Sequence, residues 1–227
     1  MRYRALLIDA DDTIFDFQAA ERAAINAVLV LAGIRDPGAG ARYARINRGY
    51  WEKLERGEVT ASELRVARFR DFAREYDVSI APETLADVFV DALSNERALI
   101  PGAQETVAAI AVHMPVAIVT NGIAQVQHAR FDASSIMRHI AAFVISGEVG
   151  FQKPDPRIID LALSRLGASA SDALFAGDSL ASDMLAAARA GVDACWYNPR
   201  GIPRPDGARI QYEIKDIREL KDIALAP

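Results

Sequence analysis

The first apolar run of the chain is Tyr3-Arg4-Ala5-Leu6-Leu7-Ile8, and Asp9-Ala10-Asp11-Asp12-Thr13 follows it directly. A short, largely apolar run of this kind is typical of a strand that is buried on both faces, as in a parallel sheet. Three carboxylates therefore stand at the carboxyl end of a predicted strand. Carboxylates this close repel one another unless a cation or hydrogen bonds neutralise them, so the segment predicts a metal, a solvated turn, or both.

Later segments repeat the pattern of a short apolar run followed by a helical pattern. We expect further strands at residues 116–119, 143–146, 173–176 and 194–196, and a last one near 211–214. Helical periodicity covers residues 103–112, 123–131, 156–166 and 182–190. This alternation predicts an α/β fold with a doubly wound, Rossmann-like parallel sheet, in which ligands gather beyond the carboxyl ends of the strands.

Residues 16–97 interrupt this alternation with long amphipathic stretches and no convincing strand. We expect helices over residues 17–32, 41–55, 60–76 and 82–94. Thr60 and Glu63 have the spacing of a capping box, and Pro82 suits a first helical turn. We therefore predict an all-helical cap domain over residues 16–97, inserted into a core made of residues 1–15 and 98–227.

The composition limits the kinds of partner. The chain has 227 residues, of which 51% are hydrophobic, and a formal net charge of −5. No basic run suggests nucleic-acid binding. Cys195 is the single cysteine, so no internal disulfide can form, and the apolar N-terminal run is too short for a membrane span. These features predict a cytoplasmic protein without a membrane or nucleic-acid partner, either a monomer or a homodimer.

Polar side chains follow the later predicted strands as well. Thr120 and Asn121 end the second, Lys153 follows the third, and Asp178 with Asp183 follows the fourth. Each of these signals alone is weak, because a turn, a helix cap or a solvated lysine would look the same. Together they supply oxygen ligands for Mg²⁺ and donors for a phosphoryl group. Phosphoryl transfer also needs a nucleophile and a proton donor, which carboxylates supply.

These segments match, in order, the four motifs of the haloacid dehalogenase superfamily. The matching residues are Asp9, Asp11 and Thr13 in the first motif, Thr120 in the second, Lys153 in the third, and Asp178 and Asp183 in the fourth. The chain is similar to subfamily I of this superfamily. Residues 9–13, 47–70 and 145–150 resemble its pyrimidine 5′-nucleotidase branch, which has a helical cap. Asp12 departs from the wider pattern, which often has Gly there, and Ser179 stands where Thr is common.

The resemblance implies a Mg²⁺-dependent phosphatase. In that pattern Asp9 attacks phosphorus to form an aspartyl-phosphate, and Asp11 acts first as general acid and then as general base. Mg²⁺ is expected on the side chains of Asp9 and Asp178 and on the backbone carbonyl of Asp11, with Asp183 holding a metal-bound water. Thr120, the backbone of Asn121 and Lys153 would hold the phosphoryl oxygens.

The resemblance also suggests a substrate, a small phosphorylated metabolite. Asn47, Trp51 and Arg68 are the cap residues expected to bind it, by stacking on a planar base or hydrogen bonding to its edge. Pyrimidine nucleoside 5′-monophosphates fit this expectation best. A sugar phosphate, phosphoglycolate or a phosphomutase reaction remains an alternative, because the predicted core recognises only the phosphoryl group.

Other reactions fit the residues less well. A haloacid dehalogenase does not use a general acid at the position of Asp11. A phosphonatase would need a cap lysine for a Schiff base, and Lys53 is the only lysine between residues 16 and 95. A receiver-like signalling module, the non-enzymatic alternative, would place its phosphorylated Asp after the third strand, where this chain has none.

Overall fold

The chain folds as an α/β protein around a six-stranded sheet in which neighbouring strands pair in parallel. The strands are β1 (Ala5–Ile8), β2 (Val116–Thr120), β3 (Ala142–Ile145), β4 (Ala173–Gly177), β5 (Asp193–Tyr197) and β6 (Tyr212–Ile214). Their order is β3-β2-β1-β4-β5-β6, so the first strand lies inside the sheet between β2 and β4. The predicted doubly wound sheet is confirmed. The computed structural model describes the backbone of residues 1–227 and all side chains except that of Glu55.

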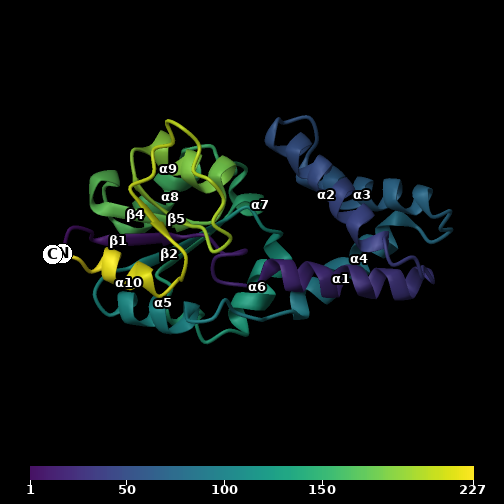
Figure 1. The fold of residues 1–227 in the computed structure, drawn as a ribbon, viewed down its shortest axis with the longest axis horizontal. Coiled ribbons are helices and arrows are strands. Elements are labelled where there is room, and N and C mark those ends of the chain that lie inside the picture. Colours follow the sequence, from purple (N-terminus) through teal and green to yellow (C-terminus); the bar gives the residue numbers. More distant parts are fainter. The chain divides into compact units, whose positions relative to one another are not determined.

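The chain divides into two compact units, which we call the sheet unit (residues 1–17 and 97–227) and the helical unit (residues 18–96). Helices cover both faces of the sheet (Figure 1). The helices of the sheet unit are α5 (Ala103–Ala111), α6 (Ala124–Asp132), α7 (Ser146–Val149), α8 (Arg157–Leu166), α9 (Leu185–Ala190) and α10 (Glu219–Ala224), with the short 3-10 helices η1 (Met137–His139) and η2 (Ala170–Asp172) and the π-helix η3 (Leu180–Met184).

Alternating side chains of β1 feed two separate apolar cores. Leu6 and Ile8 pack in the core on the side of α5 and α10, whereas Ala5 and Leu7 pack in the core on the side of α8 and α9. All four are fully buried. Burial on both faces explains why β1 is uniformly apolar and does not alternate with polar residues.

The third strand ends one residue earlier than expected. Ile145 pairs with Thr120, the last residue of β2, and Ser146 begins the short helix α7. Because the neighbouring strand stops at Thr120, Ser146 has no partner on β2 with which to extend the ladder. The strand therefore turns into a helix at the edge where the polar strand ends gather.

The helical unit contains α1 (Phe17–Ala32), α2 (Ala39–Glu55), α3 (Ala61–Glu75) and α4 (Pro82–Asn95). Its core is aromatic: the ring of Tyr43 lies 5.3 Å from that of Phe69 and 5.4 Å from that of Phe89. The predicted capping box is present, with Thr60 accepting from the backbone of Glu63 and the Glu63 side chain accepting from Thr60. Pro82 occupies the first turn of α4 as expected.

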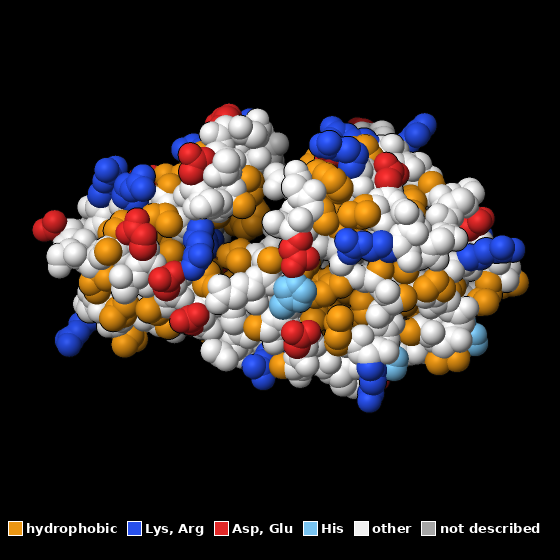
Figure 2. All heavy atoms as spheres, turned by 180° about the vertical axis from the view of Figure 1, so that it is seen from behind, with side chains coloured by type: hydrophobic (Ala, Val, Ile, Leu, Met, Phe, Trp, Pro, Cys, Tyr) orange, Lys and Arg blue, Asp and Glu red, His pale blue; other side chains and the backbone are white. Residues whose placement is uncertain are grey.

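Charged side chains of both signs are interspersed over the face drawn in Figure 2. Over the described residues, no helix combines the length and the apolar character that a membrane crossing requires.

Candidate active site

Asp9 stands at the carboxyl end of β1 and begins a tight loop. Its backbone N–H donates to Ala176 on β4 at 2.9 Å, which ties the start of the loop to the sheet. The loop then turns back on itself, because Ile14 and Phe15 both donate to the carbonyl of Ala10 at 2.9 Å. Asp12 has a φ of 59°, the left-handed conformation that Gly adopts freely and Asp tolerates. The left-handed conformation explains why the wider superfamily pattern often has Gly at the position of Asp12.

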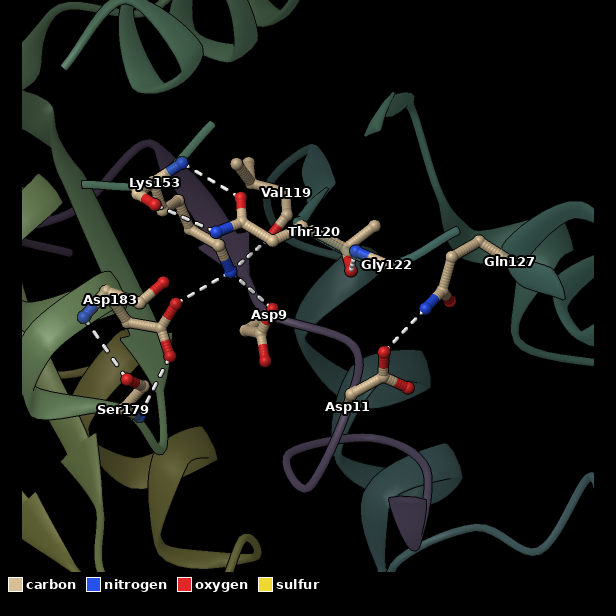
Figure 3. Close-up of polar contacts among 11 residues, drawn as sticks. Asp9, Asp11, Val119, Thr120, Gly122, Gln127, Lys153, Ser179 and Asp183 are labelled. Carbon is tan, nitrogen blue, oxygen red and sulfur yellow. Dashed lines mark hydrogen bonds and ion pairs between the residues drawn. The ribbon is translucent and has the colours of Figure 1, made fainter. Parts of the chain in front are cut away.

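Lys153 lies at the centre of the site. Its side chain is buried. The ammonium donates to the carbonyl of Val119 at 2.8 Å, pairs with Asp183 at 2.7 Å and contacts Asp9 (Figure 3). Burial by itself lowers the pKa of Lys153, but Asp183 and Asp9 reverse this effect, so its pKa is raised and it stays charged.

Asn121 anchors the segment that carries Lys153. Its side-chain amide donates to the backbone carbonyl of Lys153 at 2.8 Å and accepts from the backbone N–H of Lys153 at 2.9 Å. Thr120, fully buried beside it, accepts from the N–H of Gly122 at 3.0 Å. The end of β2 is thereby joined to the loop after β3, and the hydroxyl proton of Thr120 is left to donate elsewhere.

Asp178 and Asp183 follow β4 across a π-helical turn, η3, where we expected the start of a regular helix. Asp183 is fully buried and accepts from the backbone N–H of Ser179 at 3.0 Å. The Ser179 hydroxyl accepts from Ser182, so it caps this turn. Gly177 lets Asp183 pack closely, because a Cβ at residue 177 would lie 2.5 Å from Asp183 Cγ.

Asp9, Asp178 and Asp183 each direct a carboxylate oxygen into one cluster, and these oxygens lie within 4.8 Å of one another. Burial, and then the charge of neighbouring carboxylates, raises the pKa of Asp178 to about 8; burial likewise raises the pKa of Asp9 well above its usual value despite Lys153. Three carboxylates face one ammonium in this cluster. A hard divalent cation with oxygen ligands would balance the remaining negative charge, so the residues fit Mg²⁺.

Asp11 does not join this cluster. Figure 3 shows its side chain turned toward Gln127, away from Lys153. One carboxylate oxygen accepts from Gln127 at 2.7 Å and the other from Arg130 at 2.6 Å. Both partners lie on α6 and were not expected at the site. The sequence signal that could have identified them is their spacing of three residues, which places both on one face of the helix that follows Thr120.

The three residues expected to bind substrate from the helical unit differ in exposure. Arg68 is buried, with its guanidinium 4.7 Å from the ring centre of Phe89, and it donates to Asn47 at 2.8 Å. Asn47 is buried too and donates to Glu21 at 2.6 Å. Trp51 is partly exposed. Arg68 and Glu21 thus fix the amide of Asn47, and Trp51 has the most accessible side chain of the three.

Comparisons with known proteins identify the family. Residues 3–191 match the haloacid dehalogenase-like hydrolases. YfnB of Bacillus subtilis is 34% identical over 98% of this chain and 95% of its own. Its magnesium-bound crystal structure, which reveals interdomain movement, has a TM-score of 0.91 at 33% identity and covers 99% of this chain and 100% of that one.

Two further relatives have assigned substrates. The pyrimidine 5′-nucleotidase PynA of Streptococcus pneumoniae is 30% identical over 98% of this chain and 95% of its own. The pyrimidine 5′-nucleotidase YjjG of Escherichia coli is 28% identical, with 98% of each chain covered. With its parallel sheet and its carboxylate cluster at the strand ends, the chain belongs to the haloacid dehalogenase-like hydrolase family.

Proposed function

We propose that this protein is a Mg²⁺-dependent phosphatase that hydrolyses pyrimidine nucleoside 5′-monophosphates through an aspartyl-phosphate. The observation that carries the proposal is the arrangement of Asp9, Asp178 and Asp183 around the buried ammonium of Lys153. This arrangement combines a carboxylate nucleophile, a cationic side chain and a group of carboxylates that could bind a second cation, as phosphoryl transfer requires.

In the first step a carboxylate oxygen of Asp9 forms a bond to phosphorus, and the bond from phosphorus to the ester oxygen breaks with its electron pair on that oxygen. Asp11 gives its proton to the departing oxygen, so the nucleoside leaves as a neutral alcohol. In the second step water attacks phosphorus, the bond to Asp9 breaks with its electron pair on the carboxylate, and Asp11 takes the proton of the water. The products are the alcohol and inorganic phosphate.

The remaining site residues hold the phosphoryl group. The ammonium of Lys153, the hydroxyl proton of Thr120 and the backbone N–H of Asn121 are donors at one corner of the site, next to the start of α6. Asp9, Asp178 and the backbone carbonyl of Asp11 are the proposed ligands of Mg²⁺, with Asp183 placed to hold a metal-bound water. When bound, the ion would neutralise phosphoryl oxygens and favour in-line attack.

The substrate class rests on the two nucleotidase relatives and on the helical unit. In that unit Asn47 has its amide held by Arg68 and Glu21, and Trp51 is partly exposed. We propose that Trp51 stacks on a planar base and that Asn47 lies at its edge, with Arg68 acting through Asn47. Deoxyribonucleotides such as dUMP and dTMP are the substrates we expect.

The test is kcat/KM over a panel of nucleotides, sugar phosphates and phosphoglycolate in Mg²⁺, since discrimination between substrates is expressed in that ratio. We expect a pyrimidine nucleotide to lead the panel. Trp51→Leu should raise KM for dUMP and leave KM for p-nitrophenyl phosphate unchanged. If a sugar phosphate or phosphoglycolate leads by more than ~10-fold, the nucleotidase assignment fails while the phosphatase assignment stands.

A further inference from the structure

Asp11 is held by two buried donors from a single helix. Gln127 and Arg130 are both buried, and each donates to a different oxygen of the Asp11 carboxylate. The Asp11 side chain itself is 22% exposed. Its orientation is therefore fixed from the protein side while one edge stays open to solvent.

Neighbouring residues pack closely against both donors and hold them in place for this contact. Gln127 passes close to Gly122, where an added Cβ would lie 2.8 Å from Gln127 Cδ. The guanidinium of Arg130 lies 4.1 Å from the ring centre of Phe15. A side chain in place of Gly122, or a smaller residue in place of Phe15, would disturb the approach to Asp11.

Among the described residues, the charge of Arg130 is stabilised chiefly by Asp11 and by the ring of Phe15. The Nε and Nη2 atoms of Arg130 are buried and have no hydrogen-bond partner among the described residues, and its Nη1 atom pairs with Asp11. Burying a charged pair costs desolvation energy that the attraction within the pair often does not repay, so this arrangement needs a reason other than stability. The contact of Arg130 with Asp11, in the loop after β1, supplies that reason.

The two donors constrain the carboxylate in different ways. Arg130 can only donate, so the oxygen it contacts, Oδ1, must remain an acceptor. Gln127 has both a donor and an acceptor, and its Oε1 is buried without a partner among the described residues. An amide flip therefore lets Gln127 meet Oδ2 in either hydrogen-bonding role.

We propose that Gln127 and Arg130 are positioning residues for the proton transfers of Asp11, an inference that rests on the proposed function. They keep its carboxylate out of the cluster around Lys153 and present Oδ2 in one orientation to the departing oxygen and then to the water. In this proposal neither residue contacts the phosphoryl group or the departing oxygen, although Gln127 donates to Oδ2. Their effect passes through Asp11.

The experiment compares dUMP, whose leaving alkoxide needs a proton, with p-nitrophenyl phosphate, whose leaving anion needs little help. Gln127→Met and Arg130→Met should lower kcat for dUMP by about 10- to 100-fold and kcat for p-nitrophenyl phosphate by less than ~3-fold, with KM nearly unchanged. Arg130→Lys should restore part of the loss. Gln125→Met, an exposed position on the same helix, is the matched control and should behave as wild type.

A double-mutant cycle separates this role from general damage. In an Asp11→Asn background, Gln127→Met should cause no further selective loss, because the group it positions is already disabled. Equal losses on both substrates, or a full additional loss in the Asp11→Asn background, would overturn the inference. Crystal structures give a readout without activity: the Asp11 side chain should leave its wild-type orientation in Arg130→Met, and an unchanged orientation counts against the role.

These outcomes are distinct from failure of the proposed function. If wild-type protein with Mg²⁺ hydrolyses neither substrate, the proposed function fails, and the orientation of Asp11 in the variant crystals still decides whether α6 positions it. Should Arg130→Met not fold, Gln127→Met carries the kinetic test.

Discussion

Asp9 and Asp11 are two residues apart, yet their carboxylates pair with different buried cations, Lys153 for Asp9 and Arg130 for Asp11. Each cation comes from a separate element, the loop after β3 and helix α6. Carboxylates of one short loop would otherwise share a cation and raise each other's pKa. In the proposed mechanism, this separation lets Asp9 act as nucleophile while Asp11 exchanges a proton.

Asp9→Asn should reduce phosphatase activity to below ~0.1% of wild type, because a neutral amide cannot attack phosphorus. The fold should survive, since the side chain keeps its shape. Rates with p-nitrophenyl phosphate and circular dichroism of both proteins check this. Intact-mass spectrometry after acid quenching should detect a phosphorylated chain for wild type alone; a fully active variant would remove the covalent mechanism.

Metal removal should abolish activity and lower stability. With Mg²⁺ at about 100 times its Kd, we expect the melting temperature of wild type to rise by about 5–10 °C, and EDTA to reverse both effects. In Asp178→Asn the rise should disappear, because a proposed ligand is lost. Without metal, Asp178→Asn should melt no lower than wild type, since the substitution removes a charge that burial disfavours. Full activity in EDTA would contradict the metal requirement.

Gly177→Ala tests the close packing of Asp183. Its new Cβ would lie 2.5 Å from Asp183 Cγ, so the carboxylate must move away from Lys153. We expect a loss of about 1–3 kcal/mol in the free energy of unfolding and at least ~10-fold in kcat. Gly147→Ala is the control, because outside its chain neighbours and its own helix backbone no heavy atom lies within 4 Å of its added Cβ. Thermal melts and rates of the two variants should differ; equal behaviour would show that the close approach does not matter.

Cys195 should be inert in the folded protein. It is fully buried, and burial raises the pKa of its thiol to about 12. At pH 8 the thiolate fraction is then on the order of one in ten thousand. Ellman's reagent should find no reactive thiol in native protein and one per chain in denaturant. Rapid reaction of native protein would mean that β5 opens easily.

Several features could be predicted from local sequence because their causes are local. The uniform apolar run of β1 and the spacing of Thr60 and Glu63 each express a rule that involves only neighbouring residues. The gathering of polar side chains at one edge follows from the parallel sheet alone. For this reason the residues around Lys153 could be anticipated before their distances were known.

Other features depend on contacts between distant segments. Gln127 and Arg130 look like ordinary polar residues of a helix, and their contacts with Asp11, in the loop after β1, form only in the folded chain. The burial of Lys153 likewise depends on distant segments, because Asn121 holds its backbone and three oxygens from other elements contact the ammonium. Helix α10, which we did not expect, is six residues long and has a short periodic pattern.

The central position of β1 bears on how the protein is made. β1 is synthesised before the other strands of the sheet. It must pair with β4, which begins at Ala173, as well as with β2. At ordinary rates of translation, one edge of this fully apolar strand waits on the order of ten to thirty seconds for its second neighbour. The helical unit is continuous in sequence and can complete its own core within that interval. Nascent or truncated chains that end before β4 therefore carry an unpaired, apolar strand edge. We expect such chains to depend on chaperones or to aggregate.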